Sequence, residues 1–430
     1  MSWNRYCAVS FVFAFALAAH LAYFAASNGD FFYPDSATYL VPAHNLEHGL
    51  GFVDAMHRPE TIRTPGYPLF LILTRNAVAA VLVQHLLAAL LAVAVFFVAE
   101  RWGNRRTAWI AALLFIVDTP TIHYANKVLS ETLFTVVFFA IVVASRHPER
   151  SRGTWGGGWR AAALPGPSTA LGMTVGVLVL IRPVAILWFV VIALFIRPRK
   201  AMIAFVISAL LLPVAWGVRN RAKTGVFTIA SVAGTNMLMY RAAGALAIMD
   251  DYEFPDALAD RQRELLDEAQ ALIEREEHVP DATELPHAVQ AKYYGSLGRR
   301  IFLQHPPGAF FITLRGIEMN VFDSDADSMQ IVSRVPESIV MMTIDAFTHI
   351  EFLLAIAGLF VMWKRNRELA LFIALTLLYF IVISAGGESE ARFRVPLMPL
   401  YAICAAFAIS GASMTRTPDD GGRSIASTSA

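Results

Sequence analysis

Long apolar runs occur along the whole length of this chain, and they limit the folds that it can adopt. We expect membrane helices near 7–26, 77–99, 107–124, 128–145, 168–181, 183–196, 201–218, 340–363, 369–385 and 395–413. A helix needs about 20 mainly apolar residues to cross a bilayer, so several of these runs are short. Only 16% of the 430 residues are charged, against about 25% in soluble domains. The sequence therefore predicts an all-α polytopic membrane protein.

The first run, from Cys7 to Ala26 after Arg5, has two interpretations. It fits a cleaved signal peptide, and it also fits an uncleaved first span. We favour the span, because the run is long enough to cross and further spans follow it.

Basic residues gather in alternate loops. This basic set comprises Arg5; Arg101, Arg105 and Arg106; Arg146, Arg150, Arg152 and Arg160; Arg197, Arg199 and Lys200; and Lys364, Arg365 and Arg367. The positive-inside rule makes this side cytoplasmic and predicts that both termini are cytoplasmic. The other loops then emerge together on the opposite face, where they can share one site: the first loop, residues 127–131, the turn at Arg182, residues 219–335 and residues 386–394.

The first of these loops, residues 31–68, is dense in acidic, aromatic and histidine side chains. Asp35 follows Pro34 and opens a predicted short helix from Ser36 to Leu46. Asp35 fits a plain helix-start residue, and it equally fits a carboxylate kept ionised at a helix start as a general base. Arg63 precedes a Pro-Gly-Tyr-Pro turn, at a position where an arginine could pair a lipid phosphate.

Three more charged positions lie at the ends of apolar runs on the same predicted face. Glu131 is either a helix-start residue or a functional acid, because acids at membrane depth are costly. Arg182, before Pro183, is either a kinked interface anchor or a phosphate-binding cation. The cluster from Glu388 to Arg394 is denser than snorkelling arginines alone explain, which favours a functional or scaffolding role.

Other segments carry weaker signals. We expect an amphipathic cap helix over 255–277, an interfacial helix over 286–304 and a Gly/Pro-rich linker over 153–168. The acidic stretch Asp323 to Asp327 fails the calcium-loop pattern, because Ser328 replaces the required glycine. No ATP-binding, metalloprotease or hydrolase motif occurs, and nothing points to nucleic acid. Use of a divalent cation stays open.

Two motifs in the first loop resemble a known family. Tyr33-Pro34-Asp35 with Tyr39, and Arg63 to Pro68, are similar to bacterial polyprenyl-phosphate-sugar glycosyltransferases of the GT-C class. This superfamily includes the protein O-mannosyltransferases and the lipid A aminoarabinose transferase. Further matches follow in order at Gln84, Ser130 to Leu133, Leu180 to Pro183, Trp216 to Asn220 with Gly225, and Glu390 to Leu397. Together they span most of residues 1–410.

The resemblance implies a GT-C-like bundle of about ten transmembrane helices with interfacial helices on the periplasmic face. It implies inverting transfer of a sugar from a polyprenyl-phosphate carrier to an acceptor hydroxyl at that face of the inner (plasma) membrane. Asp35 matches the family's active-site aspartate and is the predicted base. The residues expected to bind the donor phosphate are Arg63, Arg182, Arg392 and Arg394, and those expected to orient them or contact the sugar are Tyr39, Tyr67, Glu131 and Glu390. Many members have an acid directly after the aspartate; Ser36 stands there, which weakens a metal role.

The predicted parts are a membrane core over 1–218 with its catalytic loop 27–64, an external helical segment over 219–335, C-terminal spans over 336–414 and a disordered tail over 415–430. The expected partners are a polyprenyl-phosphate-linked sugar, the bilayer, and a glycolipid, polysaccharide or protein acceptor. A lipid-linked sugar transporter or flippase is the main alternative, because a span broken at Arg182-Pro183 would suit it. An inactive scaffold for envelope assembly is the third.

Overall fold

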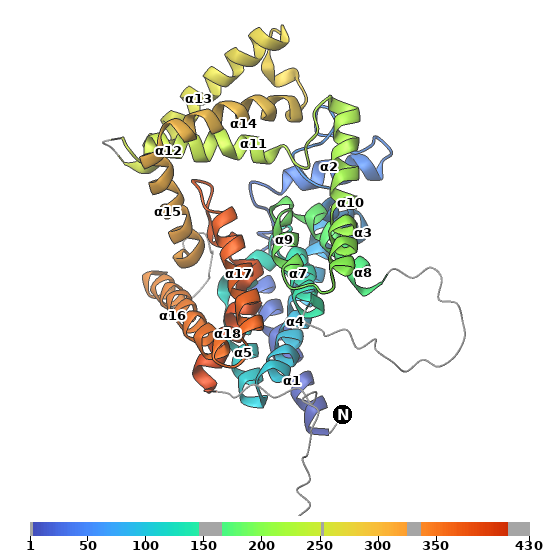
Figure 1. The fold of residues 1–430 in the computed structure, drawn as a ribbon, viewed down its shortest axis with the longest axis vertical. Helices are drawn as coiled ribbons and strands as arrows, with labels where there is room; N and C mark the ends of the chain where they lie inside the picture. Colours follow the sequence, from blue (N-terminus) through green and yellow to red (C-terminus); the bar gives the residue numbers. More distant parts are fainter. Residues whose placement is uncertain (1–2, 146–165, 251–252, 325–336, 412–430) are drawn as a thin grey trace, which may run out of the picture.

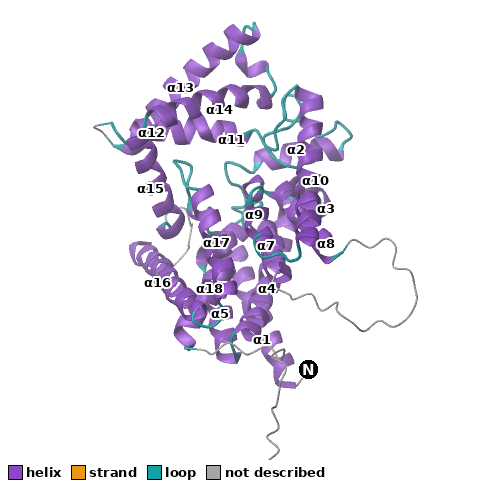
Figure 2. Ribbon diagram, viewed as in Figure 1, coloured by secondary structure: helices purple, strands orange, loops and turns teal. Residues whose placement is uncertain are grey.

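The fold is built from helices and the loops that join them (Figure 2). The computed structural model describes residues 3–145, 166–250, 253–324 and 337–411. Within these ranges there is no β-strand, only an isolated bridge between Val53 and Pro59. The all-α prediction is confirmed. The predicted tail and most of the predicted linker lie outside the described residues, as does the acidic stretch beyond Ser324.

A long bundle forms one part of the molecule (Figure 1). Its helices are α1 (Trp3–Ala26), α4 (Ala77–Trp102), α5 (Arg105–Val117), α6 (Thr119–Ala125), α7 (Glu131–Ser145), α8 (Pro167–Ile181), α9 (Trp188–Ala193), α10 (Arg199–Thr224), α16 (Glu337–Trp363), α17 (Arg367–Ile383) and α18 (Met398–Ser410). Helix α18 packs between α5 and α16, and α4 packs between α1 and α5. One apolar core, rich in Ala and Phe, runs through these contacts. Each of the ten predicted apolar runs is helical over most of its described residues.

Five helices of the described chain are long and apolar enough to cross a membrane: Arg5–Ala26, Ala77–Trp102, Arg199–Thr224, Ser338–Trp363 and Ala391–Ser410. The predicted run 107–124 is instead two helices, α5 and α6, which bend by 55° at Asp118 and make a sixth span if they count as one. Three shorter apolar helices are α7, α8 and Pro183–Ala193. The chain is thus a multi-pass membrane protein, and the count of about ten spans stays a prediction.

A separate helical layer stands above the bundle in Figure 1. This cap module comprises α11 (Val232–Asn236), the π-helix η2 (Met237–Ala242), α12 (Ala243–Ala247), α13 (Phe254–Glu277), the short turn η3 (Ala282–Glu284) and α14 (His287–Gln304). Its core includes Leu265, Ala269 and Ile273, three residues of the apolar stripe predicted for α13. Helix α15 (Pro306–Phe322) then leads back to the bundle. The predicted cap helix is confirmed.

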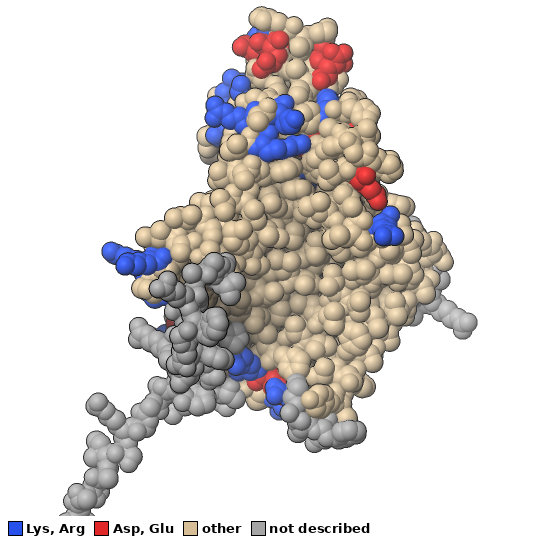
Figure 3. All heavy atoms as spheres, turned by 90° about the vertical axis from the view of Figure 1, so that its right-hand side faces the viewer, with Lys and Arg blue, Asp and Glu red and all other residues tan. Residues whose placement is uncertain are grey.

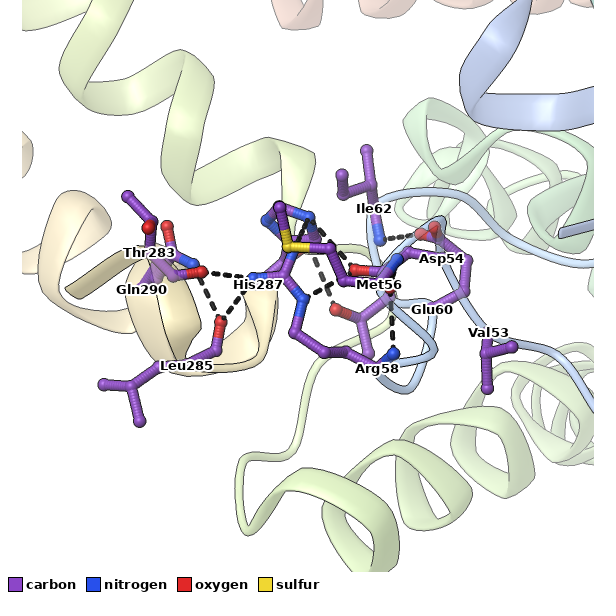
Figure 4. Close-up of polar contacts among 12 residues, drawn as sticks. Val53, Asp54, Met56, Arg58, Glu60, Ile62, Thr283, Leu285, His287 and Gln290 are labelled. Carbon is purple, nitrogen blue, oxygen red and sulfur yellow. Dashed lines mark hydrogen bonds and ion pairs between the residues drawn. The ribbon is translucent and has the colours of Figure 1, made fainter. Parts of the chain in front are cut away.

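The first loop connects the bundle to the cap module. It contains α2 (Ala37–Glu47) and α3 (Gly66–Thr74), a helix where the sequence predicted only a turn. Figure 4 shows Arg58 reaching from this loop to the cap. Its guanidinium pairs with Asp54 at 2.8 Å, lies 3.0 Å from His287 Nε2 and donates to the Leu285 carbonyl oxygen at 3.2 Å. This junction fixes the cap against the loop that carries Asp35.

The two ends of the bundle differ in the charged residues they hold. At one end Arg5 and Arg105 both pair with Glu100, at 2.6 Å and 3.0 Å, so two predicted cytoplasmic segments lie together. On the face drawn in Figure 3, a broad belt almost without charged side chains separates that end from the charged cap. An uncharged belt of this kind is what a bilayer-embedded surface requires. Which end faces the cytoplasm stays a prediction.

Candidate functional site

Asp35 lies at the opposite end of the bundle from Glu100, just before α2. Its two carboxylate oxygens contact two different arginines. Arg63 Nη2 lies 2.8 Å from Oδ1, and Arg392 Nη1 lies 2.7 Å from Oδ2. The Asp35 side chain is 30% exposed, whereas those of Arg63 and Arg392 are 15% and 12% exposed. The carboxylate is therefore the accessible member of the group, and the two cations flank it from within the protein.

Electrostatics keep Asp35 ionised. Burial alone would raise the pKa of its carboxyl group, but Arg63 and Arg392 outweigh burial and lower the pKa below its ordinary value. The Arg63 side chain is held in turn. Its Nε donates to Thr38 Oγ1 at 2.8 Å, and its guanidinium lies 4.7 Å from the centre of the Tyr39 ring. These contacts fix Arg63 against α2, beside the carboxylate.

Arg392 joins Asp35 to the loop before α18. Its Nε pairs with Glu390 Oε2 at 2.8 Å, and that carboxylate accepts a hydrogen bond from the Tyr33 hydroxyl at 3.1 Å. The rings of Tyr33 and Phe393 lie 5.1 Å and 5.2 Å from the Arg392 guanidinium. Residues 33–35 and 390–392, more than 350 positions apart, thus form one network. The sequence placed both segments on one face and the structure brings them into contact.

Glu131 and Arg182 form a second pair nearby. Arg182 Nη1 lies 2.6 Å from Glu131 Oε1, with the two side chains 14% and 2% exposed. The Phe393 ring lies 5.6 Å from Arg182, so the same aromatic ring contacts both Arg182 and Arg392. A Cβ on Gly66 would fall 2.5 Å from the Leu180 carbonyl oxygen. Only glycine allows that approach, which brings the end of the Arg63 loop against the segment before Arg182.

Two predicted tyrosines have structural partners. The Tyr39 hydroxyl lies 3.3 Å from Ser130 Oγ, and the fully buried Tyr67 donates to Gln84 Oε1 at 2.6 Å. Ser36, at the position where many GT-C members carry an acid, is buried and donates to the Val128 carbonyl oxygen at 3.0 Å. A carboxylate there would face a carbonyl without a proton to share, so in this chain position 36 joins two loops.

Arg394 is the one predicted phosphate-binding arginine that lies apart from these pairs. Its side chain is buried, and its Nη1 donates to the carbonyl oxygens of Val321 and Asp323, at 3.1 Å and 2.6 Å. The structure therefore groups Asp35, Arg63 and Arg392 with Glu390, and Glu131 with Arg182. We refer to these six residues as the charged site.

The cap module adds residues that the sequence did not single out. Arg241, on the π-helix η2, pairs with Glu388 at 3.0 Å. A Cβ on Gly387 would fall 2.5 Å from the Tyr240 carbonyl oxygen, so the Gly386–Gly387 loop lets η2 approach closely. Burial and the carboxylates of Glu390 and Asp35 raise the pKa of the Tyr240 hydroxyl, so this tyrosine lies near the charged site. A π-helix is often found at a functional position.

Within the described ranges, no group of three or more His, Cys, Asp or Glu side chains could hold a metal ion. The acids of the charged site are each matched to an arginine instead.

No protein-family model and no curated protein matches the chain. Solved structures that match include ArnT from Cupriavidus metallidurans bound to undecaprenyl phosphate, with 12% identity, a TM-score of 0.38 and coverage of 94% of this chain and 78% of that one. The apo oligosaccharyltransferase of Archaeoglobus fulgidus matches with 12% identity, a TM-score of 0.48 and coverage of 94% and 51%. The oligosaccharyltransferase AglB from the same organism, in complex with an inhibitory peptide and a dolichol-phosphate, matches with 13% identity, a TM-score of 0.43 and coverage of 95% and 51%.

The chain is thus similar to these solved structures at 12% to 13% sequence identity. This chain spans about half the length of the archaeal enzyme. The three TM-scores lie between 0.38 and 0.48. A functional assignment has to come from the charged site.

Proposed function

We propose that this protein is a membrane glycosyltransferase that moves a sugar from a polyprenyl-phosphate carrier to an acceptor hydroxyl. The observation that supports it is the accessible Asp35 carboxylate, held between Arg63 and Arg392 at 2.8 Å and 2.7 Å. One general base beside two cations matches what this reaction needs, because the leaving group is an anion and requires no proton.

The proposed reaction is a single displacement. The acceptor oxygen attacks the anomeric carbon, the bond from that carbon to the phosphate oxygen breaks, and the acceptor proton passes to Asp35. The sugar is transferred with inversion and the polyprenyl phosphate leaves as an anion. Arg63 and Arg392 bind the phosphate, with Arg182 beside them, and Glu131 and Glu390 orient the arginines.

The ion pairs also give Asp35 two states. Without a donor, Arg63 and Arg392 lower the pKa of its carboxyl group, so it is ionised but a weak base. A donor phosphate competes for the same two guanidinium groups, which bind phosphate well. As they turn to the phosphate, the carboxylate loses its partners and becomes more basic. The base would then be strongest when both substrates are in place.

The proposal also assigns the charged site to one side of the membrane. The charged site lies at the end of the bundle opposite the Arg5–Glu100–Arg105 contacts, and we place it on the periplasmic side of the inner membrane with both termini cytoplasmic. Residues 1–218 supply the core and the first loop 27–64. Residues 219–335 cover the site and residues 336–414 supply the last spans.

An Asp35→Asn variant tests the base. In proteoliposomes with a polyprenyl-phosphate sugar and an acceptor, loss of the base should lower the transfer rate by about 10² to 10⁴-fold. Donor binding should persist, because Arg63 and Arg392 remain. Transfer at the wild-type rate would exclude Asp35 as the base. Movement of the lipid-linked sugar across the bilayer with no transfer would favour the transporter, an alternative that the 55° bend at Asp118 keeps relevant.

A further inference from the structure

A second group of ionisable side chains lies inside the bundle. Asp118 is fully buried at the bend between α5 and α6. Glu351, in the middle of α16, and Arg394, just before α18, are each 2% exposed. We refer to Asp118, Glu351 and Arg394 as the buried cluster. Intramembrane ionisable residues are costly, so each needs a reason.

The helices that carry these residues pack together. Helix α18 lies between α5 and α16, and α15 contacts α16. Aromatic rings pack between the same helices: Phe352 lies 5.9 Å from the Tyr401 ring and 5.4 Å from the Phe322 ring. The charged groups that act on Glu351 are Asp118 and Arg394. The three residues therefore share one apolar interior.

Many side-chain donors and acceptors of the buried cluster have no hydrogen-bond partner among the described residues. Neither carboxylate oxygen of Glu351 accepts a hydrogen bond from them, nor does Asp118 Oδ1, and Arg394 Nε and Nη2 find no acceptor. Four buried neutral atoms of the same helices and of α6 and α15 also lack a described hydrogen-bond partner, namely Thr121 Oγ1, Asn320 Oδ1, Thr348 Oγ1 and the Tyr401 hydroxyl. Buried polar groups are nearly always satisfied, so this concentration points to a bound partner too small to need an open pocket.

The charge of the cluster identifies that partner. Two carboxylates beside one guanidinium leave one negative charge in an apolar interior. An uncompensated buried charge costs several kcal/mol, and a buried carboxyl group usually avoids this cost by taking up a proton. A metal cation would meet repulsion from Arg394, whereas a single proton on one carboxylate cancels the excess negative charge and leaves the cluster neutral. Water molecules satisfy the remaining donors and acceptors at sites of this kind.

We propose that the buried cluster is a proton-binding site, with Glu351 carrying the proton and water joining it to Asp118 and Arg394. Glu351 is chosen over Asp118 because Asp118 Oδ2 accepts a hydrogen bond from the Thr121 backbone N–H at 2.9 Å, which favours its charged form. With Glu351 neutral, Asp118 and Arg394 balance each other. The guanidinium can then keep its bonds to the Val321 and Asp323 carbonyls and so hold the segment that carries Arg392.

Several of the packed elements contribute polar or charged groups to this interior. The α5–α6 bend contributes Asp118, α18 contributes Tyr401 and Cys404, and the turn before α18 contributes Arg394. Helix α15 contributes the neutral Asn320, and α16 itself contributes Thr348 beside Glu351. Arg394 is the sole cation acting on Glu351 among the described residues, so no second arginine compensates the two acids.

Carbodiimide labelling of the full chain in detergent tests the proposal. Dicyclohexylcarbodiimide adds across the O–H of a protonated carboxyl group in an apolar setting, and the O-acylisourea rearranges to a stable N-acylurea. Glu131 is a matched internal control, because it is buried to the same 2% but ion-paired with Arg182. We expect mass spectrometry to find several-fold more adduct on Glu351 than on Glu131, and less as the pH is raised. A Glu351→Gln variant should lose that adduct alone.

The pH dependence of thermal unfolding tests the proposal even if dicyclohexylcarbodiimide cannot reach Glu351. If folding takes up a proton at Glu351, the apparent Tm of the wild type should fall as the pH rises above about 4, the ordinary pKa of glutamate in the unfolded chain, because raising the pH then favours the unfolded chain. Glu351→Gln should flatten that slope. Selective labelling or a flattened slope supports the site. Equal labelling of Glu351 and Glu131, together with identical slopes in both proteins, overturns it. Neither readout depends on sugar transfer, so the site can fail while the proposed reaction stands.

Discussion

The charged site and the buried cluster contain the same chemical groups in opposite states. Asp35, Glu131 and Glu390 each have an arginine within 2.8 Å, and the site is open enough that the Asp35 side chain is 30% exposed. Glu351 has no such partner within the described ranges and is 2% exposed. Residues 392 and 394 link the two, because Arg392 points to Asp35 while Arg394 lies among the buried acids.

In the charged site the ion pairs can open to bind a ligand, whereas in the buried cluster the excess charge has to be neutralised. An arginine that is paired with a carboxylate can bind a phosphate in its place, because the guanidinium group is already held in position. A buried carboxylate without a partner has no such exchange available, and protonation is its least costly state. Carboxylates of equal burial should therefore respond differently to the same substitution, and this can be measured.

The largest effect is expected at Glu131. Glu131→Gln removes the charge that pairs with Arg182 and leaves a nearly buried guanidinium unpaired, which should lower the free energy of unfolding by about 3–5 kcal/mol. Thermal unfolding in detergent would measure it. Adding Arg182→Met to the same protein should recover much of the loss, since the pair is then replaced by uncharged side chains. A loss near zero would mean that Glu131, like Glu351, gains no stability from an ion pair, and the two glutamates would then not differ.

The next effect concerns the donor. Arg392→Ala removes the guanidinium that joins Asp35 to Glu390, and it should weaken donor use by about 10- to 100-fold, as expected for one charge-assisted contact of about 1.5–3 kcal/mol. The apparent KM for the polyprenyl-phosphate sugar is the quantity to measure, beside the KM for the acceptor. Arg261→Ala is the control, because Arg261 pairs with Asp250 and Glu264 within the cap module. Equal weakening for donor and acceptor would contradict a phosphate role.

A smaller effect should appear in acid. Arg63 and Arg392 hold the pKa of Asp35 below its ordinary value, so these pairs stabilise the fold above about pH 4 and lose that contribution as the pH falls through the lowered pKa. The apparent Tm of the wild type should therefore decline more steeply below about pH 4 than that of Asp35→Asn. Parallel curves would show that Asp35 gains little from its arginines.

Much of this arrangement could be predicted from the sequence. Apolar runs gave the bundle helices, and loop arginines placed Asp35, Arg63, Glu131, Arg182 and Arg392 on one face, because hydrophobic length and basic loops are read directly from composition. The sequence could not predict which partner each arginine contacts. Arg392 and Arg394 are two positions apart in one motif, and only the turn between them sends one guanidinium to Asp35 and the other to α15.

The buried acids were missed for a different reason. Asp118 precedes Pro120 and Glu351 interrupts the run 340–363, so the rule that singled out Glu131 applies to both. They lie within apolar runs, where a single acid hardly changes the mean hydropathy. The cap module's η2 left no signal either, because a π-helix depends on the packing that stabilises it.

The smallest expected effect is that of Glu351→Gln at about pH 4, the ordinary pKa range of glutamate. If Glu351 is neutral in the folded protein, Glu351→Gln should change the free energy of unfolding by about 1 kcal/mol or less at about pH 4, where the glutamate is largely protonated in the unfolded chain as well. At higher pH the wild type must take up a proton on folding, so the variant should become the more stable of the two, by up to about 1.4 kcal/mol per pH unit. Thermal unfolding beside Glu131→Gln would test this, because both wild-type glutamates are 2% exposed. A stability difference that stays the same from about pH 4 to neutral pH would mean that Glu351 is ionised in the folded wild type, because folding then takes up no proton. A loss as large as that of Glu131→Gln would mean that Glu351 is paired after all.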